Sequence, residues 1–259
     1  MSLLQVSELG IDFGGLKAVN GVDMNIKEGE ILSIIGPNGA GKTTLFNLIS
    51  GFLKPNKGRM IFDGTELTGM PAHRIATHGL VRTFQKTNLF SEVTVREGVA
   101  MGFHKSRHAG LLSVLFNGRE ARAEIREVKC RTKEVLDFVG LASLADYRGK
   151  NLPYGKQRML AVAVALAAEP KLLMLDEPAT GMNPNESQEL MNLIHRLRDE
   201  KKITICLIEH NMNVVIKISD RIVVMNCGKK VAEGLPQEIT TNDIVIEAYL
   251  GRGFANAQN

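Results

Sequence analysis

The first 35 residues alternate between apolar and polar positions. Apolar side chains recur at every second position in three stretches, Leu4/Val6, Ile11/Phe13 and Val22/Met24/Ile26. This period predicts half-buried β-strands. A polar turn over 27–30 then precedes the mostly apolar run Ile31–Ile35, which we expect to be a fully buried strand. A glycine-rich loop follows, and we expect a helix over residues 43–52 that stops before Pro55.

The middle of the chain has a helical period instead. From residue 86 to 166 strand signals are scarce, and one stripe of a predicted amphipathic helix is formed by Ile125, Val128, Thr132, Val135, Leu136 and Val139. The polar stretch 103–118 around a short apolar patch predicts a surface insertion.

The longest apolar run, Met159–Ala168, has ten residues. A ten-residue helix spans roughly 15 Å, about half of a bilayer core, so we expect no membrane-spanning segment.

Strand and helix signals alternate again in the last third. Strands are predicted at Leu172–Leu175, Thr204–Ile208 and Arg221–Met225, with a helix at Glu186–Arg198 after the first of them. Such alternation predicts crossover connections and a largely parallel sheet covered by helices. The predicted fold is therefore an α/β core interrupted by a helical insert.

Composition adds few constraints. Lys and Arg (32) nearly balance Asp and Glu (28), which gives a net charge of +4 and no case for nucleic-acid binding. Cys130, Cys206 and Cys227 show no CxxC spacing, and no charged-then-apolar leader begins the chain. These features predict reduced thiols in the cytosol.

The loop after Ile35 carries the clearest chemical signal. Residues 36–44 match G-x-x-x-x-G-K-[ST] between a predicted strand and a predicted helix, which is the context that the motif requires. Glycines let backbone N–H groups surround phosphate oxygens, the lysine supplies a cation and the first threonine hydroxyl can bind Mg²⁺. We therefore expect a nucleotide to be bound by Asn38, Gly39, Ala40, Gly41, Lys42, Thr43 and Thr44.

Two acids end the buried strand at 172–175. Asp176 is placed to bind Mg²⁺ together with Thr43, and Glu177 is placed to polarise an attacking water. Two acids after an apolar run would by themselves be a solvated strand end, and only the phosphate loop favours the catalytic interpretation.

Several further landmarks together resemble the ATP-binding subunits of ABC transporters. They are Gln85 in Val81-Arg-Thr-Phe-Gln, the segment Leu152–Arg158, Leu172–Pro178 and Ile208-Glu-His210. The chain is most similar to the ATPases of branched-chain amino-acid importers. This resemblance implies a RecA-like P-loop NTPase core with an N-terminal antiparallel β subdomain at 1–85 and 167–259, and an inserted α-helical subdomain at 86–166.

The resemblance also implies roles for single residues. Phe13 would stack on adenine, although its place on an alternating strand also fits core packing. Gln85 would sense Mg²⁺ and the attacking water, and His210 would contact the γ-phosphate. Asn183, where the family has Asp, would have only an interface role. Leu89, Phe90, Val93, Val95 and Val99 would pack the insert, with one or two of them lining a groove for a coupling helix.

The family's signature segment, Leu-Ser-Gly-Gly-Gln, corresponds here to Leu152, Pro153, Tyr154, Gly155 and Lys156. In the family it contacts the ATP of the opposite subunit through a serine hydroxyl and helix-start amides. Pro153 has neither hydroxyl nor N–H, which puts the serine contact in doubt. We hypothesise that the Lys156 charge approaches the partner's γ-phosphate.

The resemblance implies a peripheral ATPase at the cytoplasmic face of the cell membrane, with ATP and Mg²⁺ as cofactors. Its partners would be membrane permease subunits, a second identical or related ATPase subunit and, indirectly, a periplasmic or extracellular binding protein. Alternatives are another ABC system such as lipopolysaccharide export, a non-transport ABC ATPase and, more distantly, a P-loop kinase.

Overall fold

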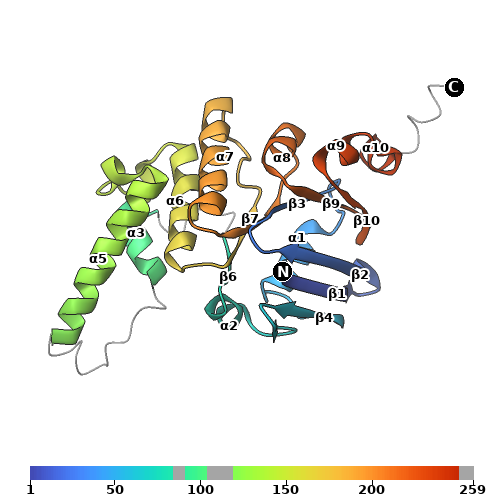
Figure 1. Cartoon of the computed structure of the whole chain (residues 1–259), viewed down its shortest axis with the longest axis horizontal. Helices are drawn as coiled ribbons and strands as arrows, with labels where there is room; N and C mark the ends of the chain where they lie inside the picture. The colour runs from blue at the N-terminus through green and yellow to red at the C-terminus, as the bar shows by residue number, and fades with distance from the viewer. Residues whose placement is uncertain (84–90, 104–118, 251–259) are drawn as a thin grey trace. The chain divides into compact units, whose positions relative to one another are not determined.

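The chain forms two compact units in a computed structural model that describes residues 1–83, 91–103 and 119–250. The first unit comprises Met1–Arg82, Lys171–Thr180 and the chain from Met191 onward. The second comprises Thr83–Pro170 and Gly181–Leu190. Figure 1 shows the elements of both units; the described strands all belong to the first.

An antiparallel sheet in the first unit has the strand order β2-β1-β4-β5. Its strands are β1 Ser2–Phe13, β2 Leu16–Lys27, β4 Lys57–Phe62 and β5 Thr65–Glu66. Within β1 the pairing with β2 shifts between Val6 and Leu9, and Glu8 between them has a φ of 51°. Before this bulge the even-numbered Leu4 and Val6 are buried, and after it the odd-numbered Leu9 and Ile11 are buried. The extra residue of the bulge explains this change of alternation.

A second sheet has the order β10-β9-β3-β8-β7-β6. Its strands are β3 Ile31–Ile35, β6 Leu80–Arg82, β7 Leu172–Asp176, β8 Thr204–Ile208, β9 Arg221–Asn226 and β10 Lys229–Gly234. They pair in parallel except for β10, which is antiparallel to β9. Every residue of β3, β7 and β8 is buried, in keeping with their mostly apolar sequences. The predicted parallel sheet is confirmed.

The register of this sheet positions the candidate site. Ile34 of β3 lies opposite Ile208 of β8, and Ile208 lies opposite Asp176 of β7. Because the three strands are parallel and in step, the loops that follow them start at the same edge. Ligands of open α/β sheets bind at this carboxyl edge.

The helices of the first unit are α1 Lys42–Ile49, α2 Ala72–Thr77, α8 Met212–Ile218, α9 Pro236–Thr240 and α10 Asp243–Leu250. The prediction that the first helix reaches Phe52 is wrong by one turn. Gly51 takes a φ of 74° and the Phe52 N–H donates to the Asn47 carbonyl, so the chain leaves the helix there. Helices α9 and α10 pack against β10, and α8 packs against α9 (Figure 1).

The second unit is helical in its described part, with α3 Val95–Gly102, α5 Arg119–Val139, α6 Tyr154–Ala167 and two short 3₁₀ turns, Ala142–Leu144 and Gly149–Asn151. Helix α7, Pro184–Asp199, begins in this unit and ends in the first. Helices α3, α5 and α6 contact one another in pairs (Figure 1). None of the described helices has the length and apolar character needed to cross a bilayer.

Helix α5 buries only part of its predicted stripe. Thr132, Leu136 and Val139 are buried, but Ile125 is 65% exposed. The prediction for Ile125 is therefore wrong, because the burial of α5 begins near Val128 and leaves the preceding turns of the helix accessible. Most of the predicted surface insertion at 103–118 lies outside the described residues.

Arg221 of β9 joins the two sheets of the first unit. Its Nη2 donates to the backbone oxygen of Asn25 in β2 at 2.7 Å and to Glu30 Oε1 at 2.6 Å. Its Nη1 donates to Asn25 Oδ1 at 3.1 Å. Glu30 is 8% exposed, so the pair is held largely out of water. Arg221 also pairs with Glu233, so neutralising Glu30 removes one of the two carboxylates that this guanidinium contacts.

We expect Glu30→Gln to lower the free energy of unfolding by about 1–3 kcal/mol, the range for a hydrogen bond to a charged group. Urea denaturation followed by circular dichroism measures the change. A loss below about 0.5 kcal/mol, the range of ordinary surface substitutions, would contradict a stabilising role for this contact.

Candidate nucleotide-binding site

The loop between β3 and α1 requires glycine at particular positions. Gly36 has a φ of 149°, and a Cβ on it would lie 2.2 Å from the Met225 carbonyl oxygen. Gly41 has a φ of 94°, and a Cβ there would lie 2.4 Å from the Ala18 carbonyl oxygen. Any side chain at either position would force the loop away from its neighbours, so its backbone N–H groups depend on glycine for their placement.

Lys42 folds back over this loop from the first turn of α1. Its Nζ donates to the carbonyl oxygens of Gly36 at 2.6 Å and Pro37 at 2.9 Å, and the residue is only 8% exposed. Burial lowers the pKa of Lys42, while the nearby Glu177 and Asp176 carboxylates act in the opposite direction. The loop therefore combines a largely buried cation with the N-terminus of α1, which suits a phosphate group.

Asp176 ends β7 in a buried ion pair. It is 4% exposed, and its Oδ2 accepts from Arg82 Nη2 at 2.7 Å. Arg82 ends β6, and its Nη1 also donates to Asn47 Oδ1 on α1 at 2.6 Å. The guanidinium lies over the Phe46 ring, 5.6 Å from its centroid. Arg82 thus fixes the carboxylate relative to α1 through one oxygen and leaves Oδ1 for other ligands.

Glu177 and His210 lie together at the ends of β7 and β8. His210 Nδ1 is 3.7 Å from Glu177 Oε1, and the Thr180 hydroxyl donates to Glu177 Oε2 at 3.5 Å. Glu177 has a φ of 47°, an unusual conformation for a residue other than glycine. The structure therefore brings together two of the three residues predicted to be catalytic. The third, Gln85, lies outside the described residues.

The remaining predicted nucleotide residues take different environments. Asn38, Gly39 and Thr43 are exposed, whereas Ala40 is buried. Phe13 is 47% exposed at the end of β1, so it is not a core residue. Of its two sequence interpretations, the accessible ring fits stacking on a base and not core packing.

A divalent ion would have few protein ligands here. No group of three or more His, Cys, Asp or Glu side chains within the described ranges could hold one. Asp176 Oδ1 and the exposed Thr43 offer oxygen ligands instead. Such a set fits Mg²⁺, which keeps waters and substrate phosphate oxygens around one or two protein groups.

The predicted signature segment lies in the second unit, at the start of α6. Leu152 is buried, Pro153 is the N-cap and Tyr154 is the first helical residue. A Cβ on Gly155 would lie 2.6 Å from Glu186 Oε1, and Lys156 Nζ lies 2.8 Å from Glu189 Oε2. The first turn of α6 therefore packs closely on α7, and the Lys156 charge is paired within its own chain.

The residues predicted to pack the insert or line a partner groove differ in their burial, and two of them are not described. Val95 and Val99 are fully buried in α3, and Val93 is half-buried. Leu89 and Phe90 lie outside the described residues. Burial of Val95 and Val99 fits packing of the helical unit.

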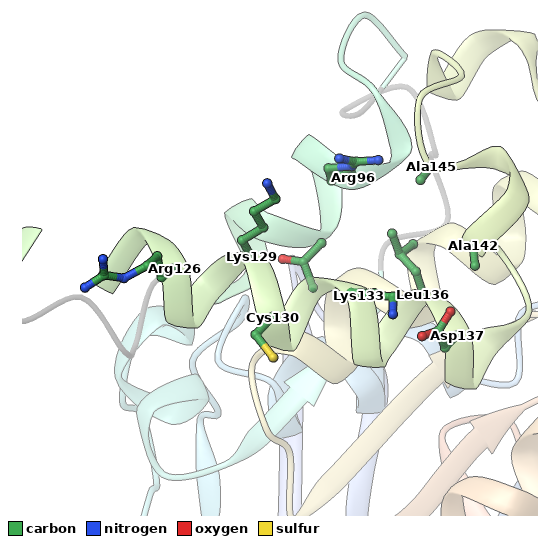
Figure 2. A pocket seen from close by; sticks show the side chains of 10 residues that line it. Arg96, Arg126, Lys129, Cys130, Lys133, Leu136, Asp137, Ala142 and Ala145 are labelled. Atoms are coloured by element: carbon green, nitrogen blue, oxygen red, sulfur yellow. The ribbon is translucent and has the colours of Figure 1, made fainter. Parts of the chain in front are cut away.

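A separate cavity of about 440 Å³ lies in the second unit beside α5. Figure 2 shows its lining side chains, which include the cations of Arg126, Lys129 and Lys133 and the thiol of Cys130. None of the residues predicted to bind nucleotide lines this cavity. The candidate nucleotide site is therefore the carboxyl edge of β3, β8 and β7.

Comparison with known families agrees with this site. The sequence profile described as "ABC transporter" matches residues 19–180, which include the phosphate loop and both acids of β7 and its following turn. The chain belongs to the ABC transporter family. It is accordingly an ATP-binding protein and an ABC-type ATPase. A second profile, described as "Branched-chain amino acid ATP-binding cassette transporter", matches residues 229–255 of this ABC ATPase.

Curated relatives cover almost the whole chain. The high-affinity branched-chain amino acid transport ATP-binding protein BraF of Pseudomonas aeruginosa is 45% identical over 96% of this chain and 98% of its own length. LivG of Salmonella typhimurium, which carries the same descriptive name, is 47% identical over the same shares.

Solved structures confirm the fold prediction, a P-loop NTPase core with an antiparallel β subdomain and a helical insert. An ATP-binding cassette of an ABC transporter in its ADP conformation has a TM-score of 0.85 and 32% identity, covering 97% of this chain and 100% of that one. A dimeric cassette in a post-hydrolysis state, bound to ADP and Pi, has a TM-score of 0.75 and 25% identity, covering 90% of this chain and 98% of that one.

Two residues that support the site were missed from the sequence. Sequence patterns alone assign no role to Arg82 or to Glu209. Both directly follow or end apolar strands that run into the sheet, where an ionisable side chain is costly to bury. A charged residue at the end of a buried strand was the available signal.

The lowered pKa of Lys42 predicts a pH-dependent affinity for ATP. Because the neutral amine no longer attracts phosphate, affinity falls as pH rises toward the pKa of Lys42, which burial lowers from its ordinary value. Lys42→Arg stays charged over the same range, so its weaker affinity loses this alkaline decline. Fluorescent-nucleotide titrations from about pH 7 to 10 measure both profiles. Parallel declines in the two proteins would contradict the assignment to Lys42.

Loss of the Arg82 cation should be costly. Arg82→Met leaves the Asp176 carboxylate buried and unpaired, so we expect the free energy of unfolding to fall by about 3–5 kcal/mol. Arg82→Lys keeps a charge near the carboxylate and serves as the matched control with a smaller loss. Chemical denaturation measures both. Equal free energies of unfolding for the methionine and lysine variants would show that the charge at position 82 does not stabilise the fold.

Proposed function

We propose that this chain is the ATP-hydrolysing subunit of an importer for branched-chain amino acids. The observation that carries the proposal is the agreement of two independent matches. The relatives with 45–47% identity over nearly the full length are named as branched-chain amino acid transport ATP-binding proteins. The C-terminal segment 229–255 matches a separate profile of the same transport class.

The site supports a mechanism based on positioning and electrostatics. The loop glycines, Lys42 and the N-terminus of α1 hold the phosphates of ATP. Thr43, Asp176 and Gln85 would hold Mg²⁺, which supplies positive charge at the transferring phosphoryl group. Glu177 polarises the attacking water, and His210 and Gln85 position it and the γ-phosphate. The 3.7 Å separation of Glu177 Oε1 and His210 Nδ1 lets both face one water molecule.

Two ATPase subunits act together in this proposal. Segment 152–156 of one subunit, with Lys156, completes the ATP site of an identical or related second subunit. For that contact Lys156 exchanges Glu189 for the partner's γ-phosphate. Core parts 1–85 and 167–259 bind the nucleotide, and the insert 86–166 contacts permease subunits at the cytoplasmic face of the membrane. The permease and a periplasmic or extracellular binding protein select the amino acid, and nucleic acid has no part.

We expect Glu177→Gln to retain ATP binding but to lose most hydrolysis, by about 10²–10⁴-fold in kcat, because the amide cannot polarise water. Nucleotide titration and phosphate release by the purified protein with Mg²⁺ measure the two effects. Lys42→Ala is the companion variant and should lose binding itself. Unaltered turnover in Glu177→Gln would remove Glu177 from the chemistry.

Uptake tests the transport proposal. Cells whose own copy of this protein has been deleted should take up radiolabelled leucine only when the wild-type chain is restored, and not with Glu177→Gln. Uptake of an unrelated sugar is the control. Normal leucine uptake in the deleted cells, together with ATPase activity of the purified chain, would point to a different cargo.

A further inference from the structure

Glu209 is a buried acid for which the proposed chemistry has no use. It follows β8 directly and is 1% exposed. A carboxylate in such a place is unfavourable unless hydrogen bonds satisfy its oxygens. Burial is the main influence on Glu209 and raises its pKa, while backbone N–H groups of Ala179, His210 and Asn211 favour the ionised form.

The hydrogen bonds of Glu209 join two loops. Its Oε1 accepts from the Ala179 N–H at 2.8 Å, and its Oε2 accepts from the His210 N–H at 3.3 Å. Ala179 lies two residues after Glu177, in the loop that follows β7. His210 lies in the loop that follows β8. One buried side chain therefore binds the backbone of both loops. One loop carries Glu177, the proposed water-activating residue, and the other carries His210, the proposed phosphate-contacting residue.

A second contact also ties the loop after β7 to β8. The Glu177 N–H donates to the Ile208 carbonyl oxygen at 2.9 Å, which ties the start of one loop to the end of β8. Glu177 keeps its positive φ of 47°, a conformation that persists only where the surroundings hold it. With the Ala179–Glu209 bond, the turn at 177–179 is held against β8 at both of its ends.

We propose that Glu209 is a positioning residue that sets the place of Glu177 and His210 relative to each other. Its side chain is buried, so it acts through the backbone groups that it binds. It acts by fixing the turn at 177–179 and the backbone of His210 to one carboxylate. The role in hydrolysis rests on the proposed function, whereas the role in holding the two loops does not.

The test compares Glu209→Gln with wild type. Glutamine keeps the size of the side chain but can accept through only one atom, so one of the two N–H groups loses its acceptor. We expect kcat for ATP hydrolysis to fall about 10- to 100-fold, the scale of a small misplacement of reacting groups, with the KM for ATP within about twofold. Amide hydrogen exchange at 177–180 and 208–211 should accelerate about tenfold, equivalent to one lost hydrogen bond.

Glu30→Gln is the matched control. It makes the same chemical change at a buried acid of the same unit, away from both loops. It should lower the melting temperature while leaving kcat of the folded protein and exchange at the two loops unchanged. A Glu209→Gln protein that behaves like this control, less stable but with wild-type kcat and exchange, overturns the proposal.

Glu209→Asp takes the place of the glutamine variant if the latter does not fold. It keeps the charge but is one methylene shorter. A lowered kcat with unchanged KM and faster exchange supports the proposal, and wild-type values overturn it. If the wild-type chain itself hydrolyses no ATP, the proposed function fails, and the exchange data alone still support or overturn the role of Glu209 in holding the loops.

Discussion

The parallel register of β3, β8 and β7 is the constraint on which the site depends. Ile34, Ile208 and Asp176 lie in line across these strands, so three loops distant in sequence begin at one edge of the sheet. The phosphate loop, the loop with His210 and the turn with Glu177 are therefore neighbours without any direct need for long-range polar contacts. The fully buried apolar faces of these strands hold the register, because a slip would expose them.

Several charged side chains lie at that edge, where they are poorly solvated. Each of them is paired with a nearby polar or oppositely charged group. Lys42 lies over loop carbonyl oxygens, and Arg82 holds one oxygen of Asp176. Both cations are largely buried, so each interacts more strongly with its partners than it would in water. The Glu177 and Asp176 carboxylates supply negative charge near Lys42 in the free protein. The pairing of Asp176 with Arg82 gives this buried carboxylate an opposite charge within hydrogen-bond distance.

The residues with expected functional roles are distributed over both units. The first unit carries the phosphate loop, the acids and His210, whereas the second carries the segment 152–156. In that segment the close packing of Gly155 against Glu186 and the pairing of Lys156 with Glu189 give the first turn of α6 a defined surface. The proline N-cap, Pro153, contributes neither a hydroxyl nor an N–H to that surface.

The sequence by itself determined the elements whose signal is local. Short, mostly apolar runs located β3, β7 and β8, and the glycine and lysine spacing located the phosphate loop. The end of α1 and the bulge at Glu8 were decided by single backbone conformations that side-chain periodicity does not record. The exposure of Ile125 was decided by which neighbours α5 meets. Only the tertiary structure could show that Arg82 lies against Asp176 and that Glu209 binds two loops, because a charged residue is buried only where folding brings a partner to it.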